Sequence, residues 1–213
     1  MYVVQHFAEE RDSVMRAYLS ENPFAALVVQ TASGLSVDHI PLEFESSYGP
    51  KGCLLGHIAR SNPLWREFES GPGMAVFSGH HAYVSPDWYA SKAADPRVVP
   101  TWNYAAVHVS GTLRFFHDVD RIREILERLT NRFESARPGP WRMTDAPPEF
   151  ISQLAGAVVG VELEIDQMIG KWKLSQNRPP EDREGVIAGL RREGSAGDRA
   201  LADLMEAQER AGS

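Results

Sequence analysis

Residues that could hold a phosphate group gather in GHIARSNPLW, residues 56–65. His57 and Arg60 stand just before Asn62, a good helix N-cap, and Pro63, a favoured first helical residue. We therefore predict a helix that starts here. Unpaired N–H groups at a helix start, beside a histidine and an arginine, are typical of a phosphate site. An arginine on an ordinary strand-to-helix turn would show the same pattern, so both interpretations stay open.

A second cluster is cationic and rich in amides, and it follows a half-exposed strand expected at residues 158–167. Around Trp172 it gathers Lys171, Lys173, Gln176, Asn177 and Arg178. We predict a loop here, and a cationic loop in an acidic protein can seat an anion. A solvated turn before the final helices is the alternative.

The third stretch is VPTWNYAAVHVSG, residues 99–111, which reads as a strand. Side chains of a strand alternate between its two faces. One face would carry core residues together with an asparagine, namely Asn103, Ala105, Val107, Val109, Leu113 and Phe115. The other would carry aromatic and polar residues, namely Trp102, Tyr104, His108, Ser110 and Thr112. This second face could line a pocket, meet another protein surface or simply cover a sheet edge.

The elements that must position these clusters follow from periodicity and turn residues. We predict helices at residues 8–20, 118–135 and 147–156, and a helical tail from 180 to 210 that breaks at 193–197. We predict strands at 24–31, 35–45, 53–58, 73–79 and 158–167, with a turn at 33–34 and a bend near 38–39. The long connection at residues 80–104 is anchored by Tyr83, Trp88 and Tyr89, which is typical of a functional loop.

Composition restricts the class of protein. The chain has 213 residues, of which 43% are hydrophobic and 24% charged, so it suits an ordinary globular domain. We see no linker, and we expect one domain at residues 1–178 with a C-terminal helical extension at 179–213. The single cysteine, Cys53, excludes a disulfide within the chain and fits a reducing cytoplasm. The net charge of -7 argues against a general nucleic-acid-binding surface.

Several common chemistries lack their motifs. No GxGxxG follows a strand and no GxxxxGK[ST] occurs, which disfavours a common dinucleotide fold and a P-loop. There is no HExxH and no GxSxG, so we predict no metal site and identify no nucleophilic residue. We find no apolar run that could span a membrane, and the amino terminus lacks the order of a secretory signal.

Five ordered motifs carry a resemblance that covers nearly the whole chain. They are HIPL (39–42), GHIARSNPLW (56–65), AYVSPDWY (82–89), VPTWNYAAVHVSG (99–111) and KLSQNR (173–178). In them the chain resembles the PaiB-type FMN-binding negative transcriptional regulators, which belong to the FMN-binding split barrels and are similar in fold to pyridoxamine phosphate oxidase. The chain has His80 and Asp87 where we expect the family to favour proline and a small residue.

The resemblance implies a mainly β, α+β fold, with a six-stranded antiparallel Greek-key split barrel flanked by helices. It also implies a homodimer that holds FMN at the subunit interface. The residues that it implies for the cofactor are His39, Leu42, His57, Arg60, Asn62, Ser85, Trp88, Tyr89, Thr101, Trp102, Asn103, Tyr104, Lys173, Gln176 and Asn177. Trp102, Asn103 and Tyr104, with the loop residues, would face the isoalloxazine ring.

Two functions follow from the resemblance. The first is a negative transcriptional regulator, although the acidic charge offers no surface for DNA. The second is a flavin-dependent oxidoreductase or flavin reductase acting on a small molecule, with His39, His108 or Tyr104 available for proton transfer. A haem-binding split barrel is a more distant alternative that depends only on the available histidines.

Overall fold

The computed structural model describes residues 1–212 of the 213, and the chain divides into two compact units. The first unit comprises residues 1–15, 78–107 and 169–213, and the second comprises residues 16–77 and 108–168. Three long strands contribute to both units: β6 (Ser70–Val84), β7 (Thr101–Phe116) and β8 (Val158–Lys173). All three run further than the sequence pattern predicts.

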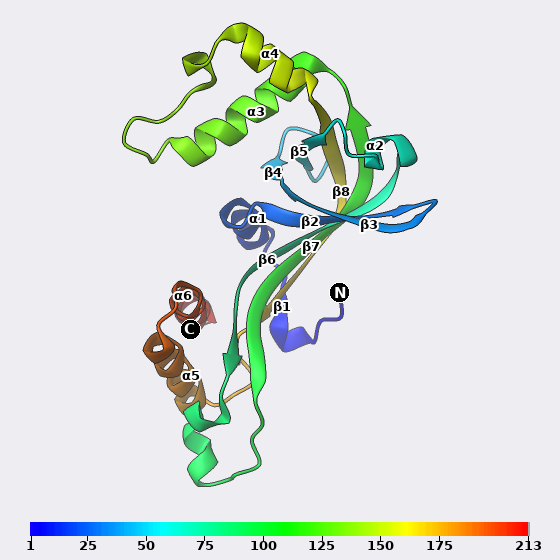
Figure 1. Ribbon diagram of the computed structural model, residues 1–213. Helices are drawn as coiled ribbons and strands as arrows, with labels where there is room; N and C mark the ends of the chain where they lie inside the picture. Colours follow the sequence, from blue (N-terminus) through cyan, green and yellow to red (C-terminus); the bar gives the residue numbers. More distant parts are fainter. Residues whose placement is uncertain (213) are drawn as a thin grey trace. The chain divides into compact units, whose positions relative to one another are not determined.

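The strands pair in the order β3-β2-β6-β7-β8-β5-β4, and β1 pairs with β8 (Figure 1). The remaining strands are short: β1 (Ala8–Glu9), β2 (Phe24–Thr31), β3 (Gly34–Pro41), β4 (Glu43–Glu45) and β5 (Cys53–Ala59). Strand β2 pairs antiparallel with β3 and β6, and β5 pairs antiparallel with β4 and β8. The mainly antiparallel fold with flanking helices is confirmed, with eight strands in place of the predicted six because β1 and β4 each add a short one.

The second unit must curl into a barrel because of one connection. Strands β3 and β4 stand at opposite ends of the pairing order, yet Leu42 alone separates them in the chain. The two ends of the sheet are therefore drawn together at this corner. Strand β5 passes so close that a Cβ on Gly56 would lie 2.7 Å from the carbonyl oxygen of Pro41.

Apolar side chains fill the barrel because each strand points alternate residues inward. The register of β5 and β8 sets Leu54 opposite Leu163 and Ile58 opposite Val159, and all four side chains are buried. Phe77, from β6, is also completely buried. Burial of apolar surface of this kind is the main favourable contribution to folding.

Two helices of the second unit match the sequence-based prediction. Helix α3 (Val119–Glu134) begins after Asp118, whose carboxylate accepts a hydrogen bond of 2.9 Å from the N–H of Arg121. Its Ile125 and Leu129 pack on Cys53 and Leu55, on the outer face of β5. Helix α4 (Pro148–Gly156) follows the short 3-10 helix η4 (Met143–Asp145).

The bend predicted near residues 38–39 is absent, and that prediction was wrong. Pairing of β2 with β3 is continuous from Thr31 opposite Gly34 to Phe24 opposite Pro41. The apparent change of phase arises because Leu35 and Val37 point outward, where they are 73% and 53% exposed. The hairpin thus presents apolar residues on both of its faces.

The amino-terminal helix starts later than predicted. Ala8 and Glu9 form β1, opposite Lys171 and Gly170 of β8, and helix α1 spans Asp12–Glu21. The short 3-10 helix η1 (Gln5–Phe7) precedes β1. Pairing with the extended end of β8 overrides the helical pattern of these residues.

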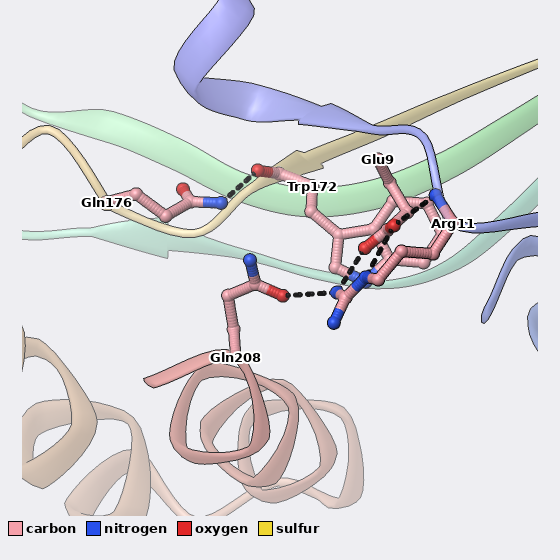
Figure 2. Close-up of polar contacts among 5 residues, drawn as sticks. All are labelled: Glu9, Arg11, Trp172, Gln176 and Gln208. Atoms are coloured by element: carbon pink, nitrogen blue, oxygen red, sulfur yellow. Dashed lines mark hydrogen bonds and ion pairs between the residues drawn. The ribbon is translucent and has the colours of Figure 1, made fainter. Parts of the chain in front are cut away.

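An ion pair fastens this amino-terminal segment within the first unit (Figure 2). The carboxylate of Glu9 is buried and accepts hydrogen bonds from the backbone N–H and the guanidinium of Arg11. The same guanidinium donates to Gln208 at 3.2 Å. Burial alone would raise the pKa of Glu9, but the hydrogen bonds and charge of Arg11 outweigh it and hold that pKa below its usual value.

The tail consists of helices α5 (Pro180–Glu193) and α6 (Ala196–Gly212), with the break where it is predicted. Gly194 adopts φ 74°, and its N–H donates to the carbonyl of Leu190, which ends α5. The first unit also holds two 3-10 helices, η2 (Pro86–Trp88) and η3 (Ala90–Ala93), in the connection between β6 and β7. Within residues 1–212, no helix is long and apolar enough to cross a membrane.

We predict that Glu9→Gln destabilises the protein by about 1–2 kcal/mol at pH 7, because a charge-assisted hydrogen bond is lost. The pKa of Glu9 is depressed in the folded state, so its contribution is present above the unfolded pKa of about 4 and is lost as the pH falls. Urea unfolding at pH 7 and pH 3.5 measures the difference. The exposed neighbour provides the control variant Glu10→Gln, and an equal loss at both pH values would contradict the assignment.

Candidate functional site

His57 and Tyr89 are predicted site residues whose buried polar atoms, Nδ1 and the hydroxyl oxygen, lack a hydrogen-bond partner among the described residues. His57 lies on β5, on the face that also carries Cys53 and Leu55. Among the described residues no atom pairs with its buried Nδ1. Burial lowers the pKa of His57, so the ring is neutral at pH 7. A buried polar atom without a partner is rare in folded proteins and indicates a group that binds there.

Arg60, from the same motif, is occupied by the protein itself. Its guanidinium donates to the carbonyl of Gly156 at 2.6 Å and to that of Val158 at 2.9 Å. These carbonyls lie at and just beyond the end of α4, where a cation is favourable. Arg60 therefore caps a helix in this structure, and a direct contact with phosphate stays a prediction.

The helix predicted to begin at Pro63 is a single turn, α2 (Leu64–Glu67). The side chain of Asn62 accepts a hydrogen bond from the N–H of Leu64 and donates one to Asp38, both at 2.9 Å. One turn has almost no dipole to attract an anion. The helix is short because the chain returns to the sheet as β6 only a few residues later, and phosphate binding at this motif stays a prediction.

Two other predicted site residues of the second unit, His39 and Leu42, lie outside this motif. His39 is exposed on the outer face of β3, with its ring 6.0 Å from that of Phe24. Leu42 is 1% exposed at the corner that closes the barrel. His108, considered for proton transfer, is half-buried, and burial lowers its pKa.

In the first unit, Trp102 forms the centre of an exposed aromatic face. It is 53% exposed, and its ring lies 5.4 Å from His81 and 6.3 Å from Tyr83 on β6. The Nζ of Lys171, on β8, lies 5.5 Å from the ring centre of Tyr104. The predicted alternation along β7 is confirmed, with Trp102 and Tyr104 on the more exposed face.

Lys173 completes this face. Its ammonium donates to the Thr101 hydroxyl at 2.5 Å and to the Trp102 carbonyl at 2.6 Å. Burial lowers the pKa of Lys173, and the nearby charges of Lys171 and Arg178 lower it further. Crowded cations beside aromatic rings fit a ligand that is flat and negatively charged.

Asn103 does not join this face. Its amide is fully buried on the opposite side of β7, donates to the Ser175 hydroxyl at 2.9 Å and lies against Met205. The hydroxyl of Ser175 donates back to the side-chain oxygen Oδ1 of Asn103 at 3.2 Å. This pair holds Ser175 at φ 65°, a left-handed conformation that is unfavourable for a residue other than glycine.

The predicted cationic loop is shorter than expected, because β8 continues through Lys173. Gln176 folds back on the chain, and its Nε2 donates to the carbonyl of Trp172 at 2.6 Å (Figure 2). Its Oε1 accepts from the N–H of Leu174 at 2.8 Å. Asn177 is exposed. Gln176 thus shapes the turn in this structure.

Ser85 and Trp88 line a common cleft of about 530 Å³ in the first unit. Its other lining residues are Tyr83, Asp87, Arg192, Glu193 and Asp198. A cleft of this volume suits a small ligand. Tyr89 instead is buried, with the guanidinium of Arg178 4.5 Å from its ring centre. Sequence reasoning missed Arg192, because one arginine on a polar helix carries no local signal.

The unusual residue Asp87 is neutralised locally. Its carboxylate pairs with Lys92 at 2.5 Å, and both side chains are exposed. Such a surface pair contributes little to stability. It does remove an uncompensated negative charge from the cleft.

We predict that Arg60→Ala lowers the unfolding free energy by about 1–2 kcal/mol, because the carbonyls at the end of α4 lose a charged donor. Thermal and urea unfolding measure it, with Arg66→Ala, an exposed arginine of α2, as the control. Unchanged stability would contradict the capping role. An FMN titration of the folded variant tests whether Arg60 also contacts the phosphate. Loss of such a direct contact would weaken FMN binding by about tenfold or more.

The sequence of this chain is similar to a protein family and to several known proteins. The family model described as "Putative FMN-binding domain" matches residues 1–167. The protease synthase and sporulation protein PAI 2 of Bacillus subtilis is 30% identical over 207 residues, which cover 97% of each chain. An uncharacterised protein of Emericella nidulans is 31% identical over 96% of each chain.

Two solved structures share the fold at low sequence identity. The FAD and heme binding protein from Mycobacterium smegmatis has a TM-score of 0.59 at 17% identity, covering 85% of this chain and 80% of that one. The flavocytochrome Anf3 from Azotobacter vinelandii has a TM-score of 0.58 at 16% identity, covering 86% and 78%. The predicted split barrel is thereby confirmed. The chain belongs to the FMN-binding domain family that its sequence matches, and its cofactor is FMN.

Proposed function

We propose that this FMN-binding protein acts as a homodimeric negative transcriptional regulator. The observation that carries the proposal is its similarity, over 97% of both chains, to a protein named for protease synthesis and sporulation. When bound, FMN supplies a ring that accepts and releases electrons. The chain's own residues hold and orient the cofactor.

Two groups of residues fit parts of FMN, each within its own unit. Trp102 and Tyr104 offer aromatic surface to a flat ring, and Lys173 offers a cation next to it. In the second unit, His57 has an unmet hydrogen-bonding atom beside a motif that also supplies Arg60. Neutral imidazole nitrogen, cations and aromatic faces are the groups that a phosphorylated flavin requires.

A second copy of the chain fits the outer face of β3, β2 and β6. The register aligns Val37 with Val28 and Val28 with Met74, so apolar residues form a continuous row across three strands. Leu35 and Phe24, which share this face, are 73% and 63% exposed. His39 also lies on this face of β3, and the other side chains that β2 and β3 place here carry no charge. A mainly apolar face of this kind is suited to pairing with itself about a two-fold axis.

A flavin-dependent oxidoreductase is the second candidate function. It is favoured by the exposure of Trp102 beside His81, because a ring more than half exposed leaves surface for a second flat molecule. The formal net charge of -7 also offers no general attraction for DNA. Regulation by an indirect route is compatible with both observations.

We predict that Val37→Glu converts the dimer to a monomer, because two copies would then bury like charges against an apolar face. Multi-angle light scattering at micromolar concentration measures the mass. Gln153→Glu, a change of equal charge on the exposed surface of α4, is the matched control and should leave the dimer intact. A Val37→Glu protein that stays dimeric would show that another surface pairs.

We also predict that deleting the gene in its own organism raises a defined set of transcripts, and that the wild-type gene restores their level. RNA sequencing of the deletion and complemented strains measures this. In parallel, the purified FMN-loaded protein is mixed with reduced nicotinamide cofactors. Unchanged transcripts together with oxidation faster than that by free FMN would overturn the regulator and support the oxidoreductase.

A further inference from the structure

The connection between β6 and β7 is fastened to helix α5 within the first unit. Asp182, in the first turn of α5, is fully buried. One carboxylate oxygen accepts a hydrogen bond from the N–H of Ser91 at 2.8 Å, and the other accepts from the Ser91 hydroxyl at 2.7 Å. A buried carboxylate needs such partners, so this contact fixes the loop at Ser91.

Two glycines of α5 admit Trp88 from the same loop. A Cβ on Gly189 would lie 2.3 Å from the indole ring of Trp88, and a Cβ on Gly185 would lie 2.0 Å from the Trp88 carbonyl oxygen. No side chain larger than hydrogen fits at either position without movement of the loop. Glycine is unfavourable in a helix interior, so packing against Trp88 accounts for both.

These contacts form one stripe along α5. Asp182, Gly185 and Gly189 follow the spacing of residues that share a helix face. Further along, α5 supplies Arg192 and Glu193 to the cleft that Ser85 and Trp88 also line. The helix therefore both anchors the loop and contributes residues to the wall of this cleft.

We propose that α5 positions the loop of residues 85–95 for FMN, with Gly189 and Asp182 as positioning residues. The inference rests on the proposed FMN-binding function and on the contact of Ser85 and Trp88 with FMN that the family resemblance implies. It extends the cofactor site to a helix beyond residues 1–167, the part that matches the family model. Neither residue touches the cofactor, since each acts through a loop residue.

The first experiment compares Gly189→Ala with Gly197→Ala, whose added Cβ meets only ordinary contacts in α6. FMN affinity is measured by titration of flavin fluorescence, and folding by circular dichroism and thermal unfolding. Overpacking at Gly189 displaces Trp88, so we expect about tenfold weaker FMN binding. The control should bind FMN as the wild type does.

A double variant tests whether Gly189 acts through Trp88. In a Trp88→Ala background the clash is absent, so adding Gly189→Ala should cause no further loss of FMN affinity. A purely structural role would lower the melting temperature in both backgrounds and leave FMN affinity unchanged in the folded protein. Normal FMN affinity of folded Gly189→Ala would therefore overturn the inference.

Asp182→Asn provides a second test that remains usable if Gly189→Ala does not fold. It keeps the shape of the side chain but removes one of the two acceptors for Ser91. A several-fold loss of FMN affinity is expected, and an unchanged affinity would refute the role of α5. If the wild-type protein itself shows no saturable FMN binding, the proposed FMN site is refuted, and this inference fails with it. That result is distinct from a wild type that binds FMN and variants that bind it equally well.

Discussion

The structure of the second unit depends on a single constraint, the one-residue connection between strands that stand at opposite ends of the sheet. Leu42 joins β3 to β4, so the sheet has to curl until its ends meet. Close packing at this corner requires Gly56, because any side chain there would strike the backbone of Pro41. The curled sheet then encloses one set of alternating side chains and leaves the other set outside.

The outward-facing side chains of these strands differ in whether another element of the chain covers them. On β5, Cys53 and Leu55 are covered by α3. On β2 and β3, nothing in the described part of the chain covers Phe24, Leu35 and Val37, which are all more than half exposed. Apolar surface that a chain leaves uncovered is expected to meet a partner, and the apolar row of Val37, Val28 and Met74 across three strands favours a second copy.

In the first unit, the two faces of β7 differ in burial. One face of β7 buries Asn103 against Ser175 and Met205, and the other exposes Trp102 with Lys173 at its edge. A buried asparagine with reciprocal hydrogen bonds and an exposed tryptophan can be adjacent in sequence because a strand points successive side chains in opposite directions. Helix α6 lies on the buried side, where its Met205 contacts the amide of Asn103, and the aromatic side is left exposed.

Local signals in the sequence determined much of this protein: the alternation along β7, the Asp118 cap of α3, the helix break near Gly194 and the motifs shared with an FMN-binding family. Tertiary structure alone decided the rest. Ala8 and Glu9 form a strand because they pair with β8. Arg60 donates its hydrogen bonds to carbonyls at the end of α4, and Trp88 packs against glycines about a hundred residues away in the chain. Periodicity and capping depend on neighbours along the chain, whereas the partner of a long polar or aromatic side chain depends on which distant backbone comes within reach.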